Sequence, residues 1–473
     1  MRSIACRRPP LPIVAVCLAL AAGCDSSPTG ESNHVQRIGV AGQAEQSDLF
    51  GRESSLRESL TSTLTSADFQ PPASAKPTAN PLATSLAVPR MKQSPTDRSA
   101  VVRIFYGTNR RERPDASRDW NDFYGSGRGD LQYGVCAVSL PPSHSYGEIE
   151  RPSIWRFEFK EDSNRHVMLR QIRPVTEDRF TAALRSVTAE EDRNEAFVFV
   201  HGYNNDFGEA ARRTAQIKHD LNFPGPAILF SWPSQGSARG YNRDREQITP
   251  SLPELTRFLQ LIARDSGAKR VHVIAHSMGN EFATRALAQI GSEAIANGRP
   301  ETAFDQLVLA APDIDAAEFA TRIAPYLRPS CTRCTIYAAD HDLALAGSQR
   351  LNRTPRLGQA GRYLVTFPSM PFVNVVDASK VDFDLFNLGH ADFSDELLAD
   401  IRGVLAGLGP DRRHLRPHQI ATAWQFVPSE FQPVSFEVDE PDRPVRIDEP
   451  AETPVPADDE AGLWASVQSW WPF

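Results

Sequence analysis

One short segment, residues 271–279, places a serine where it could act as a nucleophile. An apolar, strand-like run ends in Ala275-His-Ser277-Met-Gly, and a helical pattern over residues 280–290 follows at once. A serine on such a strand-to-helix turn is pushed out of the backbone, and small neighbours let the strand and the helix pass closely. The start of the helix adds unpaired N–H groups and a positive dipole end, which favour negative charge. We therefore predict Ser277 as a nucleophile; the alternative is a turn serine that caps the helix.

A nucleophilic serine needs a base to remove its proton, and the base needs a carboxylate to orient it. The apolar run at residues 335–339 leads into Asp340-His-Asp342, and His390 lies in a loop after the last predicted strand. We predict Asp342 as the acid and His390 as the base. Asp340 and Asp313 stay open as alternatives for the acid.

Acyl transfer by a serine also needs N–H groups that stabilise the oxyanion of the tetrahedral intermediate. The apolar run at residues 197–200 ends in His201-Gly-Tyr-Asn, and in enzymes of this chemistry such a turn supplies one backbone donor. We predict the amide of Tyr203 for this role, with Asn204 as the second choice. The other predicted donor is the amide of Met278, the residue after the serine.

Short apolar strands alternate with helical patterns around these residues. The predicted strands are 197–200, 227–230, 271–274, 307–311, 335–339 and 372–376, and the predicted helices are 207–221, 252–265, 280–290, 316–327 and 395–405. This alternation predicts an α/β fold, with a mostly parallel sheet and helices on both faces. Ligands in such sheets bind beyond the C-terminal ends of the strands. Earlier strand-like runs at 101–106, 133–140, 154–159 and 166–172 predict antiparallel neighbours.

Taken in order, these motifs resemble the α/β-hydrolase superfamily and, within it, a bacterial esterase/lipase-like family of largely unknown substrate. The resemblance covers roughly residues 101–408. The segments that carry it are Phe105-Tyr-Gly-Thr-Asn-Arg110, Tyr133-Gly-Val-Cys-Ala-Val-Ser-Leu-Pro141, His201-Gly-Tyr-Asn, Ala275-His-Ser-Met-Gly279, Ala311-Pro-Asp-Ile-Asp315, the acid loop at 337–345 and Gly389-His390. Ala275 departs from the pattern, which usually has glycine there, but alanine is small enough for the turn.

The resemblance implies serine hydrolase chemistry on an ester-like carbonyl. In this superfamily the catalytic residues follow in the order serine, acid, histidine, which Ser277, Asp342 and His390 match. This chemistry needs no metal and no cofactor. The implied substrate is a small-molecule or lipid ester.

The chain of 473 residues begins with a segment typical of export. Three arginines precede an apolar run at residues 11–22, which is shorter than the roughly 20 residues that a membrane-spanning helix needs. This is the layout of a secretory signal peptide. Its end, Ala22-Gly-Cys24, resembles a bacterial lipoprotein signal in which Cys24 becomes the lipidated first residue. We predict a lipid-anchored cell-envelope protein that faces the periplasm; soluble export and an uncleaved short anchor are the alternatives.

Composition divides the chain into four parts. Residues 1–23 are predicted as the signal peptide, 24–98 as a disordered tether rich in Ser, Thr, Pro and Ala, 99–408 as the hydrolase domain, and 409–473 as a Pro-rich acidic tail. The net charge of −8 equals that of residues 437–460 alone, so the rest of the chain is near neutral. Because no basic face is evident, nucleic acid is not a predicted partner.

A pair of cysteines, Cys331 and Cys334, precedes one of the predicted strands. The pair could form a small disulfide in an oxidising compartment, or the two side chains could be packed thiols. A structural zinc would want four ligands, so no metal is predicted there.

Residues 232–250 are predicted as a loop that carries Arg239, Arg243 and Arg245. Guanidinium groups bind carboxylates and phosphates well, so this loop could hold an anionic group of a substrate. The alternative is a solvated loop, because arginine is mostly exposed in proteins.

Together these features predict an exported serine hydrolase that cleaves carboxylic ester-like bonds through a serine, acid and histidine. The alternative from another class is a membrane-tethered, non-catalytic protein that keeps the hydrolase fold for binding or envelope assembly. The long tether and the acidic tail motivate that alternative. Neither the acyl group nor any protein partner is predicted by these residues.

Overall fold

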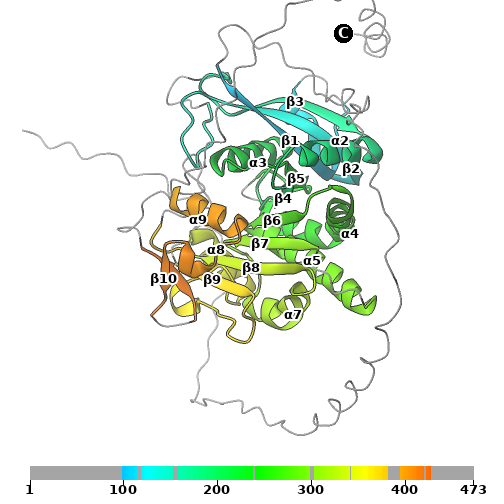
Figure 1. The fold of residues 1–473 in the computed structure, drawn as a ribbon. Helices are drawn as coiled ribbons and strands as arrows, with labels where there is room; N and C mark the ends of the chain where they lie inside the picture. The colour runs from blue at the N-terminus through cyan, green and yellow to red at the C-terminus, as the bar shows by residue number, and fades with distance from the viewer. Residues whose placement is uncertain are drawn as a thin grey trace, which may run out of the picture. The chain divides into compact units, whose positions relative to one another are not determined.

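The centre of the described chain is an 11-stranded sheet with the strand order β10-β11-β9-β8-β7-β6-β4-β5-β1-β2-β3 (Figure 1). The computed structural model describes residues 98–114, 119–152, 158, 160–237, 240–298, 303–340, 342–381, 395–419 and 422–427, all within the unit Thr78–Phe473. The strands are β1 (Ala100–Glu112), β2 (Tyr124–Leu140), β3 (Met168–Val175), β4 (Glu195–Val200), β5 (Ala227–Ser231), β6 (Arg270–His276), β7 (Phe304–Ala310), β8 (Cys331–Ala338), β9 (Val373–Asp377), β10 (Leu415–Pro417) and β11 (Trp424–Phe426).

Most neighbouring strands of this sheet run parallel. Parallel pairing joins β1, β5, β4, β6, β7, β8, β9 and β11 in turn. At one edge β2 and β3 pair antiparallel, and at the other edge β10 does so. Parallel neighbours need long crossover connections, which helices usually supply. The predicted fold class, a mostly parallel sheet with antiparallel neighbours and helices, is confirmed.

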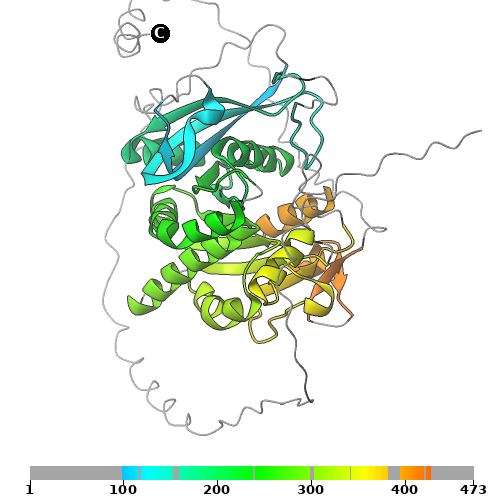
Figure 2. The ribbon, with the colours of Figure 1, turned by 180° about the vertical axis from the view of Figure 1, so that it is seen from behind.

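Helices cover both faces of the sheet (Figure 2). They are α2 (Glu177–Ala189), α3 (Phe207–Asp220), α4 (Tyr241–Asp265), α5 (Met278–Ala296), α6 (Ala316–Glu318), α7 (Ala324–Leu327), α8 (Leu343–Asn352) and α9 (Asp395–Leu405). Apolar side chains of α2, α4, α5 and α7 pack in one core, and those of α3 and α9 pack in a second core.

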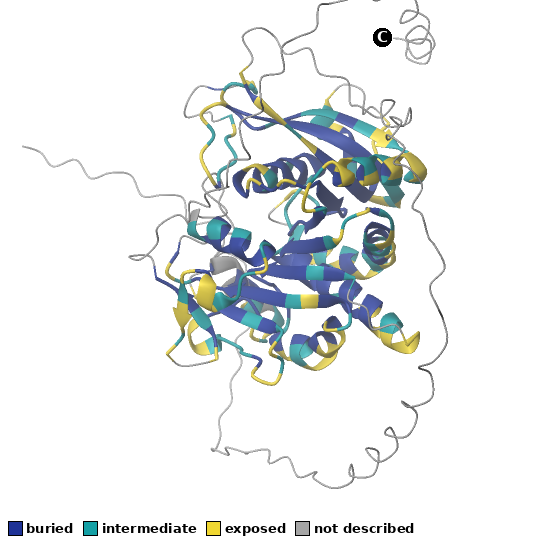
Figure 3. Ribbon diagram, viewed as in Figure 1, coloured by how far each residue is buried: buried dark blue, intermediate teal, exposed yellow. Residues whose placement is uncertain are grey.

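The strand β4 shows how the sheet serves both cores. All of its residues are buried (Figure 3). Val198 and Val200 belong to the core of α4 and α5, whereas Phe197 and Phe199 belong to the core of α3. Successive strand residues point to opposite faces, so this continuous apolar run is what a strand covered on both sides requires.

Two predicted segments have different structures from those expected. The helix α4 begins at Tyr241, so residues 241–250 are helical and not a loop. Pro250 and Pro253 lie inside this helix, and proline is a poor helix residue because it has no N–H to donate. The expected single helix at 316–327 is α6, a π-helical turn (Phe319–Ile323) and α7, whose first turn contains a proline.

The sheet continues past residue 408, where the sequence predicted the start of the acidic tail. The short strands β10 and β11 form a hairpin that joins β9. The predicted signal peptide, its lipidation site Cys24, most of the tether and residues 428–473 lie outside the described residues. Among the residues described, no helix is both long and apolar enough to cross a membrane.

Cys331 and Cys334 are free, buried thiols in β8, so the disulfide that the sequence left open is not formed. Three residues along a strand span about 10 Å, at about 3.3 Å per residue. That separation is longer than the Cα distance that a disulfide bridges. The second alternative, packed thiols, therefore describes this pair.

Candidate active site

Ser277 forms the turn between β6 and α5 in a strained backbone conformation. Its φ of 50° and ψ of −125° lie where a residue with a side chain seldom occurs. The end of β7 holds the turn, since the Ser277 amide donates to Ala310 O at 3.0 Å. The Ser277 carbonyl accepts from the Asn280 side chain at 2.8 Å and from the Asp313 amide at 3.3 Å. Strain that the surroundings maintain in this way is common at functional sites.

Two glycines let the start of α5 approach the end of β4. A Cβ atom on Gly279 would lie 2.3 Å from His201 O and 2.7 Å from Val200 O. A Cβ atom on Gly202 would lie 2.9 Å from the Cβ of Ser277. Ala275, which stands where the superfamily pattern usually has glycine, is fully buried in β6 beside β4 and β7. Close approach therefore requires glycine at 279 and 202 but tolerates alanine at 275.

We expect Gly279→Ala to destabilise the protein and to displace the turn after β4. The new methyl group would meet backbone oxygens, which cannot rotate away as a flexible side chain can. Overpacking of this kind costs about 1–3 kcal/mol. Denaturant unfolding measures the loss, and Gly127→Ala is the matched control because its Cβ atom would meet its nearest atom at 3.7 Å. Equal stability of the two variants would contradict this packing argument.

The predicted oxyanion donors lie on the turn after β4 and at the first residue of α5. Met278 begins α5 and is fully buried, and the ring of Tyr203 packs edge-on against Tyr241 at 5.5 Å. Asn204 has a positive φ of 59°, and its amide donates to the Asp244 carboxylate at 3.1 Å. Because that N–H is already used, Asn204 is poorly suited to hold an oxyanion. Tyr203 stays the predicted upstream donor.

A buried cation, Arg110, ties this turn to the loop after β5. Its guanidinium donates to Ser231 Oγ at 2.9 Å, to Ser234 O at 2.9 Å and to Asn205 O at 2.7 Å. Burial lowers the pKa of Arg110 to about 10, which still leaves it charged at neutral pH. The sequence showed Arg110 as part of a motif but not its role. The available signal was an arginine four residues after the apolar run Ile104-Phe-Tyr106.

We expect Arg110→Lys to lower the free energy of unfolding by roughly 2–4 kcal/mol, because each buried acceptor left unpaired costs about 1–3 kcal/mol. A lysine has no planar fork and cannot reach the same acceptors together. Chemical denaturation measures the effect. Arg111→Lys is the control, since Arg111 is exposed on the same strand. If both variants lose the same small amount, Arg110 does not hold these two loops.

His201 is a neutral histidine that supports the turn and is not a candidate base. Its ring stacks on Trp232 with centroids 5.2 Å apart. The Nε2 atom accepts from the Trp232 amide at 3.2 Å, so the proton resides on Nδ1, which donates to Gly202 O at 2.8 Å. Burial, together with the charge of Arg110, holds the pKa of His201 well below 6.5. Desolvation also lowers the pKa of His276, beside the serine, to about 3.

We expect His201 to make the protein less stable as the pH falls from 7 to 5. Below pH 6.5 the unfolded chain protonates this histidine, whereas the folded protein keeps it neutral. The unfolded state then binds more protons, so one such histidine lowers the free energy of unfolding by about 1.4 kcal/mol per pH unit. Denaturant unfolding at several pH values should show a smaller pH slope in His201→Gln. An unchanged slope in His201→Gln would mean that the folded protein protonates His201.

The three candidate acids differ in what already holds them. Asp342 follows β8 and is buried. Its carboxylate accepts a hydrogen bond from the Leu345 amide at 2.9 Å and so caps the start of α8. Asp340 is exposed.

Asp313 is buried, and Arg356 binds its carboxylate at 2.7 Å. The hydroxyls of two further residues also donate to the Asp313 carboxylate, at 2.7 Å from Tyr241 and 2.6 Å from Ser348.

This distribution favours Asp342 over its alternatives. The Asp313 carboxylate is committed to Arg356, and the Asp340 side chain faces solvent. Asp342 is buried at the same C-terminal strand edge as Ser277. The predicted base, His390, lies outside the described residues. The roles of Ser277, Asp342 and His390 therefore stay predictions.

Residues 241–250 of the predicted arginine loop are the first part of α4, and Arg245 there is an ion-pair residue. It donates to the Tyr241 hydroxyl at 3.2 Å and lies 3.5 Å from Glu281 of α5. Arg243 is exposed, and Arg239 lies outside the described residues. Because Glu281 compensates the charge of Arg245, the structure does not support the anion site that the sequence left open beside the solvated loop.

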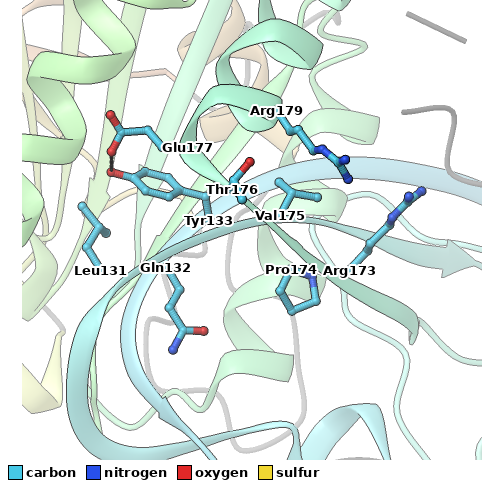
Figure 4. Close-up of a pocket in the computed structure, with 9 residues that line it drawn as sticks. All are labelled: Leu131, Gln132, Tyr133, Arg173, Pro174, Val175, Thr176, Glu177 and Arg179. Carbon is cyan, nitrogen blue, oxygen red and sulfur yellow. Dashed lines mark hydrogen bonds between the residues drawn. The ribbon is translucent and has the colours of Figure 1, made fainter. Parts of the chain in front are cut away.

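A separate pocket of about 530 Å³ lies between β2, β3 and α2 (Figure 4). Tyr133 on its wall donates to Glu177 at 2.7 Å. None of its lining residues comes from the turns around Ser277. This pocket lies at the antiparallel end of the sheet and is not part of the candidate active site.

Comparison with known proteins connects this arrangement to a family. Residues 176–402 match the family described as "Alpha/beta hydrolase of unknown function (DUF900)". This match and the mostly parallel sheet give the chain the α/β-hydrolase fold. An uncharacterized protein of Nostoc sp. (strain PCC 7120) is 36% identical to this chain over 67 residues, which are 14% of this chain and 17% of that protein.

Two solved structures of esterases share a weak likeness with this chain. One comes from a study of two fungal esterases of Rhizomucor miehei, with 13% identity, a TM-score of 0.31, and coverage of 69% of this chain and 88% of that chain. The other is a mutant of the esterase rPPE, with 14% identity, a TM-score of 0.22, and coverage of 69% and 75%. Likenesses at this level add nothing to the assignment.

Proposed function

We propose that this α/β-hydrolase is an exported serine hydrolase that cleaves carboxylic ester-like bonds. The observation that carries the proposal is the strained turn at Ser277, with φ 50° at the junction of β6 and α5. Two glycines and a hydrogen bond from β7 support that turn. A turn serine that merely capped α5 would not need this conformation, and the Ser277 side chain makes no capping hydrogen bond.

The proposed reaction proceeds in two steps through an acyl-enzyme. His390 takes the proton of Ser277 Oγ as that oxygen bonds to the carbonyl carbon of the ester. The amides of Met278 and Tyr203 stabilise the oxyanion, and each donor of this kind contributes about 3–4 kcal/mol. The alcohol leaves with the proton from His390. Water, deprotonated by His390, then releases the acid and restores Ser277.

Labelling with a fluorophosphonate probe tests this proposal directly. Such a probe forms a covalent bond with an activated serine, so wild type should label and Ser277→Ala should not. An esterase of known activity, labelled in parallel, checks the reagent. Absence of label on wild type beside a labelled standard would leave the non-catalytic binding or assembly function as the better description. Label that persists in Ser277→Ala would mean that another serine is the nucleophile.

The substrate class and the location are parts of the same proposal. A panel of small soluble esters and lipid esters would define the acyl group once labelling is established. We propose a lipid anchor on Cys24, which lies outside the described residues, and a position in the cell envelope facing the periplasm. Incorporation of a fatty-acid analogue into wild type but not into Cys24→Ala would support the anchor. Incorporation that Cys24→Ala leaves unchanged would exclude it.

A further inference from the structure

We propose that His144, His219 and Asp220 form a binding site for a divalent transition-metal ion, best suited to Zn²⁺. His144 Nε2 lies 2.9 Å from Asp220 Oδ1, and His219 Nδ1 lies 3.0 Å from the same oxygen. All three potential ligand atoms lie within 4.8 Å of one another. The site is separate from the proposed hydrolase chemistry, which needs no metal.

The cluster lies at the opposite end of the parallel strands from Ser277. The helix α3 starts soon after the C-terminal end of β4, at the edge where the turn of Ser277 also lies. It then runs back along the sheet and ends at Asp220. His144 comes from the segment 141–150 between β2 and β3. An ion here would therefore join that segment to the end of α3.

The ligand set suits a borderline metal. Two imidazole nitrogens and one carboxylate oxygen are donors that Zn²⁺ accepts, and a fourth position can hold water. Ca²⁺ and Mg²⁺ prefer six or more oxygen ligands and fit this set poorly. The His219 side chain is 38% exposed and lines a cavity of about 380 Å³. Of the three proposed ligands, His219 is the one that lines this cavity, so a water ligand would reach the ion from its side.

Surrounding groups already orient two of the ligands. The Glu150 carboxylate binds Nδ1 of His144 at 2.9 Å, which turns Nε2 toward Asp220. A carboxylate on the far nitrogen of a histidine is the usual support of a metal-bound imidazole. The second oxygen of Asp220 accepts from the Gly147 amide at 2.7 Å and from the Gln216 side chain. Asp220 Oδ1 is thereby held toward both histidines.

The charges around the cluster are compatible with a divalent ion. Two carboxylates, Asp220 and Glu150, face it. Three cations are close, but backbone carbonyls hold each of them. Lys218 donates to Phe223 O at 3.1 Å, Arg402 to Asp220 O at 2.6 Å and Arg213 to Gly147 O at 3.1 Å. An ion would replace the two N–H···O contacts that now join the imidazoles to Asp220.

Calorimetric titration of the full chain with Zn²⁺, after dialysis against a chelator, tests the proposal. His219→Ala is the main variant, because it removes one ligand near the surface and leaves Asp220, His144 and Glu150 in place. The control is His414→Asn, which removes an exposed imidazole elsewhere. We expect His219→Ala to lose one Zn²⁺ site or to bind it at least about tenfold more weakly. Wild type and the control should bind alike.

Two further measurements, Co²⁺ absorption and the melting temperature with Zn²⁺, make the outcome decisive. Co²⁺ should give visible absorption bands with wild type that are absent from His219→Ala, and Zn²⁺ should raise the melting temperature of wild type but not of that variant. Mg²⁺ and Ca²⁺ should do neither. Equal Zn²⁺ binding by wild type and His219→Ala, or no Zn²⁺ binding by wild type, would overturn the proposal. The cluster would then be a hydrogen-bonded ion pair between α3 and the segment 141–150.

Discussion

Ser277→Ala is expected to reduce kcat/KM for a chromogenic ester by roughly 10³- to 10⁶-fold, the loss typical when a serine nucleophile is removed. The reason is chemical and local, because the variant lacks only the oxygen that would bond to the ester carbonyl. The hydrogen bonds that hold the turn involve only the backbone of Ser277. Its carbonyl accepts from Asn280 and Asp313, and its amide donates to Ala310. The variant should therefore fold with wild-type stability, and denaturant unfolding measured beside the kinetics would verify this.

Ser237→Ala is the matched control for this experiment. Ser237 is exposed in the loop after β5, so its removal should leave both the rate and the stability unchanged. A Ser277→Ala protein that is folded and retains more than about one-tenth of the wild-type rate would rule out Ser277 as the nucleophile. Loss of activity together with loss of folding would instead point to a structural role for this turn, which circular dichroism would reveal.

Asp342→Asn is expected to lower kcat by about 10³- to 10⁴-fold, as removal of the acid does in serine hydrolases. An amide cannot stabilise the charged imidazole that forms when the base takes the serine proton. The side-chain oxygen of asparagine can still accept from the Leu345 amide, so the cap of α8 should survive. Stability should then change little, and the loss should appear in kcat more than in KM.

The two alternative acids give distinguishable results. Asp340→Asn alters an exposed side chain and should have little effect on either rate or stability. Asp313→Asn should lower the free energy of unfolding by roughly 3–5 kcal/mol, because it leaves the buried Arg356 cation without its carboxylate. A larger rate loss in Asp340→Asn than in Asp342→Asn would show that our assignment is wrong. So would a loss near 10⁴-fold in folded Asp313→Asn with unchanged Asp342→Asn activity.

Local patterns in the sequence determined the fold class and the candidate nucleophile. Continuous apolar runs such as that of β4 are required when both faces of a strand are covered, and the alternation with helices predicts a parallel sheet. The position of Ser277 was predictable because strand, small residues and helix follow one another within a few positions. These signals depend on neighbours in the chain, so the sequence carries them without knowledge of any distant contact.

Only the tertiary structure decided between alternatives that depend on distant partners. The Asp244 carboxylate accepts a hydrogen bond from the amide of Asn204, which is 40 positions away in the sequence. Arg356 binds the carboxylate of Asp313, which is 43 positions away. The contacts of Arg110 with the loop after β5, and of His144 with the end of α3, span even longer separations. Periodicity and spacing carry no information about which polar groups meet after folding. The sequence therefore proposed the candidate residues, and the packing of the sheet and helices decided which of them have partners.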